Sequence, residues 1–565
     1  MGYPFDKITY HIETFVEQNV EEFEKIKLFV SNQIYQPFQK FSGQKLTIRT
    51  SEITIHESKE IAIKELKQLL NNYALEMWYV IIRRFPSNAF PNPIWQYYSI
   101  LSALKWAVKE NPWNRGFQDG KTYETKGIEF AFTNDFLFDC LRVACYSNCL
   151  GDLTYKQRWV GKGLKVMVLD DISLYLIPDP KIIESVNAYE SRRPSNFILG
   201  ETGNPHLVSK EKHDLIFLQD LKNRKAVYLP KADLTLFFNR YISSTSVKGI
   251  LYYLNPYREA IKDLYGIDVE SIVQTFFALS QNIIGTIPFH QISYKENGIQ
   301  IDADLTKSED IHRLSFFFSI CHTAYLSFNL DRFKSELSKI KKHPLIGTEK
   351  SEDELISDFF NTFLLDKSKM EKIGILDITN PPVIFLNQDN TCYWDLQYFY
   401  DFIRTLIENS KNWFSSQHGD RFTLTIKSYI ESEIPNLQTI FFNKLLKYKD
   451  QNFEIDLLFY YNSKLYLIEA KAYAKNRDFW NGYRTEVVSR TGKINNSVYQ
   501  VKRSFDLLQK CFRDGLLDDV PEYNELFWIV CMPEQEYIHP IDKYGLINGI
   551  PRVCTLEELS KIILS

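Results

Sequence analysis

Residues 453–471 read FEIDLLFYYNSKLYLIEAK, and this stretch decides the fold of the C-terminal part of the chain. Two runs rich in aromatic and branched apolar side chains flank the dipeptide Asn462-Ser463. Apolar runs around a two-residue turn predict a β-hairpin. If these two residues form the turn, the numbers of cross-strand partners sum to 925, which sets Asp456 directly opposite Glu469.

Two opposed carboxylates form a site that needs positive charge. Directly opposed Cβ atoms lie about 4.5–5.5 Å apart, so Asp456 and Glu469 can grip one divalent cation between them. Without it, like charges destabilise a sheet and unpaired charges on a largely buried strand are costly. Lys471 shares a face with Glu469 because the two are i and i+2 on one strand, and the register sets Lys471 opposite Glu454. The alternative is an exposed face with ordinary surface charge, which would leave uncovered the apolar residues of the same face, Leu458, Tyr460, Leu465 and Leu467.

Asp456 followed by Glu469-Ala470-Lys471 resembles the D…(D/E)XK signature of the PD-(D/E)XK nuclease superfamily. The Pro of the eponymous pair is replaced by Ile455. This resemblance covers about residues 400–565 and implies a restriction-endonuclease-like αβββαβ domain.

The segments that follow the motif fit the same expectation. Residues 495–510 carry apolar side chains at helical spacing, and residues 526–532 form an unbroken apolar run suited to a buried parallel strand. A strand, a crossover helix and a parallel strand form a right-handed unit. Residues 552–555 and 556–564 predict a further short strand and a closing helix.

The resemblance implies metal-assisted hydrolysis of phosphodiester bonds. Asp456 and Glu469 would hold one or two Mg²⁺ ions, with Mn²⁺ as a substitute, and the carbonyl oxygen of Ala470 would be a further ligand. The ion would polarise a phosphoryl oxygen and lower the pKa of its bound water. Lys471 would orient that water or accept a proton from it. A desolvated lysine beside a cation can have its pKa lowered enough to act as a base. Gln500 matches a glutamine that superfamily members often carry on the following helix, and its alternative is a solvent-facing glutamine.

A third acid is not assigned. Many members of the superfamily have a Glu on an early helix, whereas Thr423 stands where some relatives have that Glu. Glu408 lies in an amphipathic stretch expected to be helical over residues 395–413. Asp420, close to His418, is interpreted as structural. The alternative of a non-catalytic nucleic-acid-binding or scaffold protein with a degenerate nuclease fold therefore stays open.

A basic segment begins at the motif. Residues 471–503 contain eight basic and two acidic residues, a net charge of +6, in a chain with a formal net charge of −4. Phe479, Trp480 and Tyr483 lie in this segment and could stack on unpaired bases. A phosphate backbone is the natural partner of such a patch. The alternative is a solvated loop with a few packed aromatic side chains.

The composition predicts a globular multidomain protein. The chain has 565 residues, of which 44% are hydrophobic and 15% aromatic. We expect an α+β or α/β multidomain fold, divided into a mainly helical N-terminal region with some strands (residues 1–195), a mixed α/β recognition or regulatory region (196–395) and the nuclease-like domain (396–565).

The same composition addresses location and partners. No apolar run reaches the roughly 18–20 residues that a membrane span needs, and eight scattered Cys without CxxC spacing favour reduced thiols. We therefore expect a cytoplasmic protein with no membrane partner.

The function expected from the sequence is a metal-dependent endonuclease. DNA is favoured over RNA as substrate, because most relatives cut DNA. A non-catalytic region joined to a C-terminal nuclease resembles prokaryotic restriction and anti-phage (antiviral) defence effectors. A homodimer would suit double-strand cutting, and cutting only with a partner protein or trigger is a third alternative.

Overall fold

The computed structural model describes most of the chain, namely residues 7–73, 78, 133–192, 226–230, 247–286, 292–295, 298–302, 325–365, 384–386, 390–395, 399–414, 419–473, 475–517 and 520–565. The region boundaries expected after residues 195 and 395 lie outside the described residues and stay predictions.

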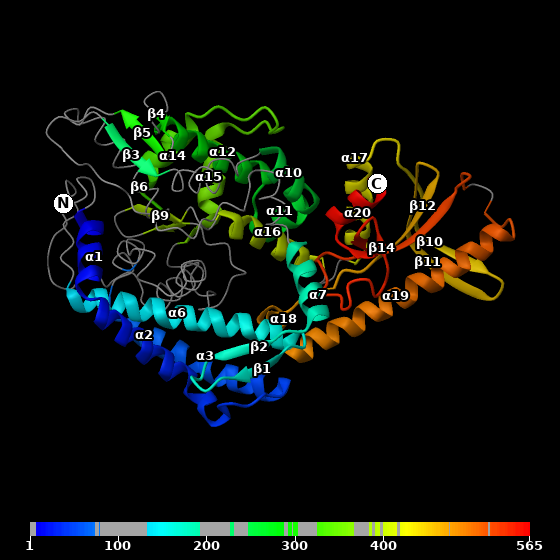
Figure 1. Ribbon diagram of the computed structural model, residues 1–565. Helices are drawn as coiled ribbons and strands as arrows, with labels where there is room; N and C mark the ends of the chain where they lie inside the picture. The colour runs from blue at the N-terminus through cyan, green and yellow to red at the C-terminus, as the bar shows by residue number, and fades with distance from the viewer. Residues whose placement is uncertain are drawn as a thin grey trace.

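The N-terminal part is built mainly from helices (Figure 1). Its elements are α1 (Lys7–Gln18), α2 (Val20–Tyr35), η1 (Gln36–Phe41), α3 (Ile48–Leu70), α6 (Asn134–Gly161), β1 (Lys165–Val168), β2 (Leu174–Ile177) and α7 (Pro180–Ser191). The side chains of Thr47, Thr133 and Asp179 accept backbone N–H groups at the starts of α3, α6 and α7, which fixes where these helices begin. Helix α6 packs against both α2 and α3, so the long helices form one layered body.

The middle part joins helices to two small sheets. Its elements are β3 (Ala226–Pro230), α10 (Val247–Leu254), η5 (Asn255–Tyr257), α11 (Arg258–Tyr265), α12 (Val269–Thr286), β4 (Ile292–Lys295), β5 (Gly298–Asp302), β6 (Tyr325–Asn329), α14 (Leu330–Ser338), α15 (Glu352–Phe363), β7 (Leu364–Leu365), β8 (Ile384–Leu386), β9 (Thr391–Asp395) and α16 (Phe399–Trp413). The strand orders are β3-β5-β4 and β6-β9-β8-β7.

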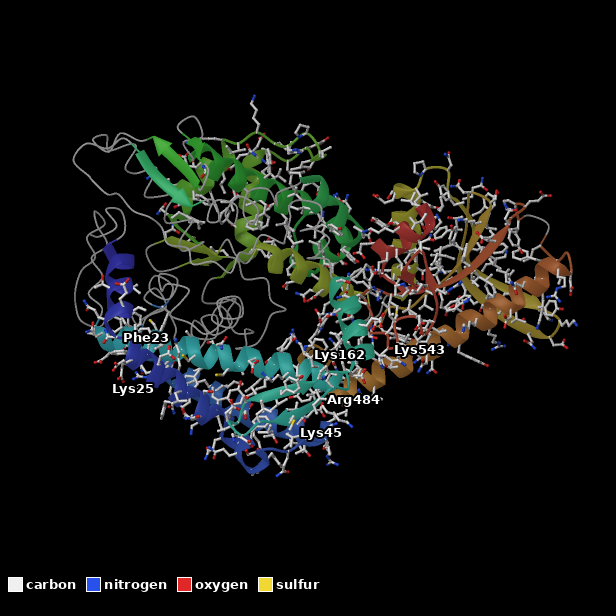
Figure 2. All side chains as sticks on the ribbon, in the orientation of Figure 1. Phe23, Lys25, Lys45, Lys162, Arg484 and Lys543 are labelled. Carbon is white, nitrogen blue, oxygen red and sulfur yellow. The ribbon has the colours of Figure 1, made fainter. Side chains whose placement is uncertain are left out.

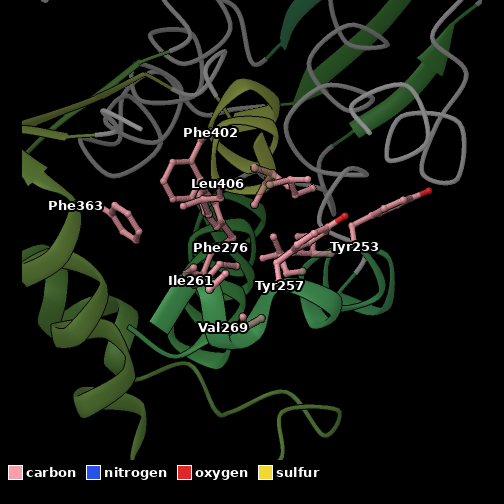
Figure 3. Packing of buried hydrophobic residues seen from close by; sticks show 14 of the residues in the cluster. Tyr253, Tyr257, Ile261, Val269, Phe276, Phe363, Phe402 and Leu406 are labelled. Carbon is pink, nitrogen blue, oxygen red and sulfur yellow. The ribbon is translucent and has the colours of Figure 1, made fainter. Parts of the chain in front are cut away.

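Aromatic side chains fill the core of this middle part, as Figure 3 shows. The rings of Phe276 on α12 and Phe402 on α16 lie 5.4 Å apart, and those of Phe363 and Phe402 lie 4.9 Å apart. Helix α16 is thus bound to the helices that precede it in the chain.

A mixed five-stranded sheet organises the C-terminal part. The elements are α17 (Gly419–Glu433), β10 (Gln438–Tyr448), β11 (Gln451–Tyr461), β12 (Lys464–Ala470), α18 (Arg477–Asn481), α19 (Arg484–Arg513), β13 (Glu525–Cys531), β14 (Leu546–Ile547), β15 (Ile550–Pro551), β16 (Val553–Cys554) and α20 (Leu556–Leu564). The strand order is β10-β11-β12-β13-β16, with β10, β11 and β12 antiparallel in sequence and β12, β13 and β16 parallel. The expectation of an α+β multidomain protein is confirmed.

The predicted hairpin register is confirmed from the turn as far as Leu457↔Ile468, and the ladder ends one position before the expected opposition of Asp456 and Glu469. Strands β11 and β12 pair from Tyr461↔Lys464 to Leu457↔Ile468, so partner numbers sum to 925. Asn462 and Ser463 have φ angles of 48° and 59°, and two positive φ angles in succession are what a type I′ hairpin turn requires.

The two faces of the sheet have separate covers. Leu457, Phe459, Tyr466 and Ile468 join the large core beneath α17 and α20. Leu458, Leu465 and Leu467 pack on α19, which runs along the opposite face (Figure 1). Leu458, Leu465 and Leu467 share the sheet face of Glu469, and α19 covers them, as we expected from the sequence.

The N-terminal helices are in close contact with the C-terminal part. A Cβ atom on Gly161, at the end of α6, would lie only 1.9 Å from the carbonyl oxygen of Gly482, which has a φ of +84°. Arg158 donates to the carbonyl oxygen of Trp480 (3.0 Å), and Arg484 donates to that of Gly161 (3.1 Å). Figure 2 shows Lys162 and Arg484 at this junction.

Candidate active site

Asp456 lies where the pairing of β11 with β12 ends. The backbone N–H of Ala470 donates to Asp456 Oδ2 at 2.8 Å. The carboxylate thus takes the place of the backbone carbonyl that would accept this N–H if the ladder continued. The expected pairing of Glu454 with Lys471 does not form, because the pairing of β11 with β12 ends at Leu457↔Ile468 and β12 ends at Ala470. Asp456 thus lies just beyond the last pair of the ladder, and Glu454 is exposed.

Glu469 and Lys471 form an ion pair at the end of β12. Lys471 Nζ lies 2.7 Å from Glu469 Oε1, with side-chain exposures of 23% and 11%. The backbone N–H of Lys471 donates to the carbonyl oxygen of Cys531 at 3.0 Å, which ties it to the end of β13. Two parallel strands therefore position the lysine, while the antiparallel neighbour supplies Asp456.

Burial raises the pKa values of both carboxylates. For Asp456 the N–H of Ala470 and the charge of Lys471 act against this rise. For Glu469 the charge of Asp456 adds to burial, and Lys471 opposes both. The negative charge of Asp456 therefore acts directly on the ionisation of Glu469.

Glu469 favours the charged form of Lys471. Burial acts to lower the pKa of Lys471, but the charge of Glu469 and the hydrogen bond to it outweigh burial, so the pKa is raised. The lowered pKa expected for Lys471 beside a bound cation stays a prediction, and the ammonium group as it stands is suited to binding anionic oxygen.

Asp420 is an acid close enough to Asp456 to affect its ionisation. It lies in the first turn of α17 and is exposed, and its charge, after burial and the charge of Glu454, helps to raise the pKa of Asp456. Thr423, one turn later, is buried. The sequence marks Asp420 only by its neighbour His418, a pair that sequence reasoning interprets as structural.

Gln500 lies on the solvent-exposed side of its helix. It is exposed on α19, whose packed face near this point carries Ser497, Val498 and Val501. Its catalytic role stays a prediction. Glu408 is buried on α16, where its charge acts on Glu534 rather than on Asp456.

The expectation that aromatic side chains of the basic segment stack on bases is wrong for two of the three residues. Phe479 and Trp480 are each 7% exposed and pack in a cluster with residues of α7. Of the eight basic residues, Lys475 and Arg490 are also buried. Much of this segment is therefore structural, while Lys493, Lys502 and Arg503 are exposed on α19.

The donor set at the site suits a hard divalent cation. The carboxylates of Asp456 and Glu469 are both shielded from solvent, and the charge of Lys471 acts on both of them. Two carboxylates and one ammonium leave a net negative charge that a bound cation would neutralise. Across the described residues, no group of three or more His, Cys, Asp or Glu side chains is gathered to hold a metal ion. Within the described part of the chain, any metal ligands at this site beyond Asp456 and Glu469 would have to be backbone oxygens or water molecules.

Asp456→Asn should make the protein more stable. The amide can still accept the N–H of Ala470, while the repulsion between Asp456 and Glu469 is removed, so we expect the free energy of unfolding to rise by roughly 1 kcal/mol. Because the folded-state pKa of Asp456 is raised, wild-type stability falls as pH rises through that pKa. The gain should therefore be larger at pH 7 than at pH 4 in urea denaturation, and an equal gain at both would contradict the electrostatic cause.

Comparison with protein families matches the C-terminal part alone. Residues 418–538 match the model of the nuclease-related domain, NERD. The matched span includes Asp420, Asp456, Glu469 and Lys471. Comparisons with curated proteins and with solved structures give no match. Among the described helices, none has the length and apolar character of a membrane span. Residues 418–538 are a nuclease-related domain of a PD-(D/E)XK-like nuclease family.

Proposed function

We propose that this chain is a metal-dependent nuclease that hydrolyses phosphodiester bonds of nucleic acid. The observation that carries the proposal is the pair Asp456 and Glu469 with the Lys471 ammonium 2.7 Å from Glu469, inside a nuclease-related domain. A nuclease-related domain implies interaction with nucleic acid.

Asp456, Glu469 and the carbonyl oxygen of Ala470 would hold Mg²⁺, with Mn²⁺ as a substitute. Once bound, such an ion would polarise a phosphoryl oxygen and lower the pKa of its bound water.

Lys471 would bind and orient a phosphate group. Its ammonium is kept protonated by Glu469, so it can stabilise negative charge that develops on the phosphoryl oxygens. Asp456 is held in place by the N–H of Ala470, and both groups are fixed by the same strand end. Preformed charges of this kind need little rearrangement during the reaction.

The substrate, the cellular location and the biological role are proposed on grounds other than the geometry of the site. We propose DNA in preference to RNA, a cytoplasmic location, and a restriction or anti-phage defence role in which the first 395 residues recognise or regulate. These proposals rest on the resemblance to PD-(D/E)XK nucleases and on the joining of a helical region to a nuclease-related domain.

A nucleic-acid-binding protein without cleavage is the second candidate. The observation that favours it is the ion pair itself, because Lys471 already neutralises part of the charge of Glu469.

A cleavage assay separates these two functions. Labelled plasmid, linear duplex, single-stranded DNA and RNA would be incubated with Mg²⁺, Mn²⁺ or EDTA, with wild type beside Asp456→Asn. We expect cutting that requires the metal and disappears in the variant. Salt-sensitive binding with no cutting in any condition would favour the second candidate, and cutting by Asp456→Asn would exclude this site as its source.

A further inference from the structure

The chain that leads out of Lys471 has to be held by contacts other than regular secondary structure. The described residues between β12 and α18, namely 471–473, 475 and 476, belong to no helix or strand. We call residues 471–473 together with 475 and 476 the lysine segment. Its beginning is fixed by the bond from the N–H of Lys471 to Cys531.

The middle of the lysine segment is fixed from α19. Arg490 Nη2 donates to the carbonyl oxygen of Tyr473 at 2.9 Å. The same guanidinium forms a two-point pair with Glu536, with Nε–Oε2 at 3.0 Å and Nη2–Oε1 at 2.5 Å. Glu536 follows β13, so this contact again ties the segment to the chain beyond that strand.

The end of the lysine segment is fixed by the side chain of Lys475. Its Nζ donates to the carbonyl oxygen of Gln535, lies 3.6 Å from Glu534 Oε2 and 3.9 Å from Glu536 Oε1. The side chain of Lys475 is 0% exposed, so it can touch neither substrate nor solvent. A buried ammonium is costly unless its partners are well placed, and here they are three consecutive residues of one chain segment.

The N-terminal region also packs against the Lys475 ammonium. The Lys475 ammonium lies 5.3 Å from the ring centre of Tyr189 on α7, and 5.0 and 5.2 Å from those of Phe479 and Trp480. Arg192, which follows α7, donates to the carbonyl oxygen of Glu536 at 3.3 Å. Figure 1 shows α7 standing between the N-terminal helices and the C-terminal part. The support of the lysine segment therefore includes residues that lie outside the nuclease-related domain.

We propose that Lys475 is a positioning residue of the nuclease site, which holds the lysine segment against residues 534–536 and thereby keeps the Lys471 ammonium beside Glu469. This inference rests on the proposed function. Residues 180–192 of the N-terminal region complete the packing around Lys475. They therefore contribute to the geometry of the nuclease site without contacting Asp456, Glu469 or Lys471.

The chain contains a matched control for a merely structural role. Lys411 on α16 is 1% exposed, its Nζ lies 3.7 Å from a carboxylate oxygen of the buried Glu557, and it lies 5.4 Å from the ring centre of Tyr257. Lys411 thus has the burial, the pairing distance and the aromatic neighbour of Lys475, but it does not contact the lysine segment.

The test compares Lys475→Met with Lys411→Met in the full chain. A charge-balanced variant, Lys475→Met with Glu534→Gln, avoids leaving Glu534 buried without its cation. We expect kcat to fall by roughly 10- to 100-fold in both Lys475 variants with KM changed by about twofold at most, because a small displacement of a reacting group costs rate rather than binding. Lys411→Met should retain the wild-type kcat.

Amide hydrogen exchange gives a second readout that needs no cleavage. Peptides covering residues 472–476 should exchange faster in both Lys475 variants than in wild type or Lys411→Met. Unchanged exchange, or wild-type kcat in the charge-balanced variant, would overturn the positioning role. If wild type cuts no substrate, the proposed function fails, and the exchange comparison alone still decides whether Lys475 holds the segment.

Discussion

Lys471→Met is expected to lower the rate of phosphodiester cleavage by about 10²- to 10³-fold, the cost of removing one preformed group that stabilises developing charge. Methionine keeps an unbranched apolar chain but carries no charge. The ammonium that lies 2.7 Å from Glu469 would be absent, and Glu469 would lose the partner that opposes its raised pKa. Single-turnover cleavage and equilibrium binding on the same labelled substrate would give the rate and the affinity separately.

Lys464→Met is the control for this substitution. Lys464 lies at the other end of β12 and pairs with Glu525 at 3.9 Å, so the change removes a lysine from the same strand without touching the site. We expect its cleavage rate to match that of wild type. Equal rates for Lys471→Met and wild type would remove Lys471 from the mechanism, and a loss of binding equal to the loss of rate would make it a docking residue.

Arg192→Met should cost about 3–5 kcal/mol of unfolding free energy, because it leaves Glu558 as a buried carboxylate without its cation. Arg192 Nε lies 2.5 Å from Glu558 Oε1 and Nη2 lies 2.8 Å from Oε2, with side-chain exposures of 11% and 5%. The same guanidinium donates to the carbonyl oxygens of Val553 and Glu536. Urea denaturation of the full chain would measure the loss.

The loss should depend on pH in a defined direction. Burial acts to raise the pKa of Glu558, but Arg192 and the N–H of Thr555 outweigh it and lower that pKa. A lowered acid pKa gives stability that is present at neutral pH and is lost as pH falls through the folded-state pKa, below the usual value of about 4.3. The gap between Arg192→Met and wild type should therefore shrink on acidification. The double variant Arg192→Met with Glu558→Met should recover most of the stability, and a purely additive double variant would contradict the pairing.

The local part of the site was predictable from sequence because it depends on nearest neighbours. The period of two in a strand and a two-residue turn fix the register, so the amino-acid order alone groups Asp456, Glu469 and Lys471. The closing helix over residues 556–564 is marked by Thr555 and Glu558, which form a capping box.

The rest of the site depends on contacts between distant segments. The charge of Asp420 acts on Asp456 because α17 packs against β11 and β12, and no sequence pattern states that packing. The basic segment was misread for the same reason, since Lys475 is neutralised by Glu534 and Glu536 rather than by solvent or phosphate. Charge counted along a chain cannot distinguish a surface patch from a buried network whose partners lie elsewhere.

The contact between Gly161 and Gly482 bears on how such a protein can evolve. Recombination moves a catalytic unit between genes most easily when its border is a flexible linker that tolerates any neighbour. Here two backbones touch so closely that a single added Cβ atom on either glycine meets the other chain segment, at 1.9 Å from Gly161 and 2.5 Å from Gly482. A graft of residues 418–538 onto another protein would have to carry the end of α6 and α7 with it. A substitution at either glycine would therefore have to be accommodated by both parts of the chain.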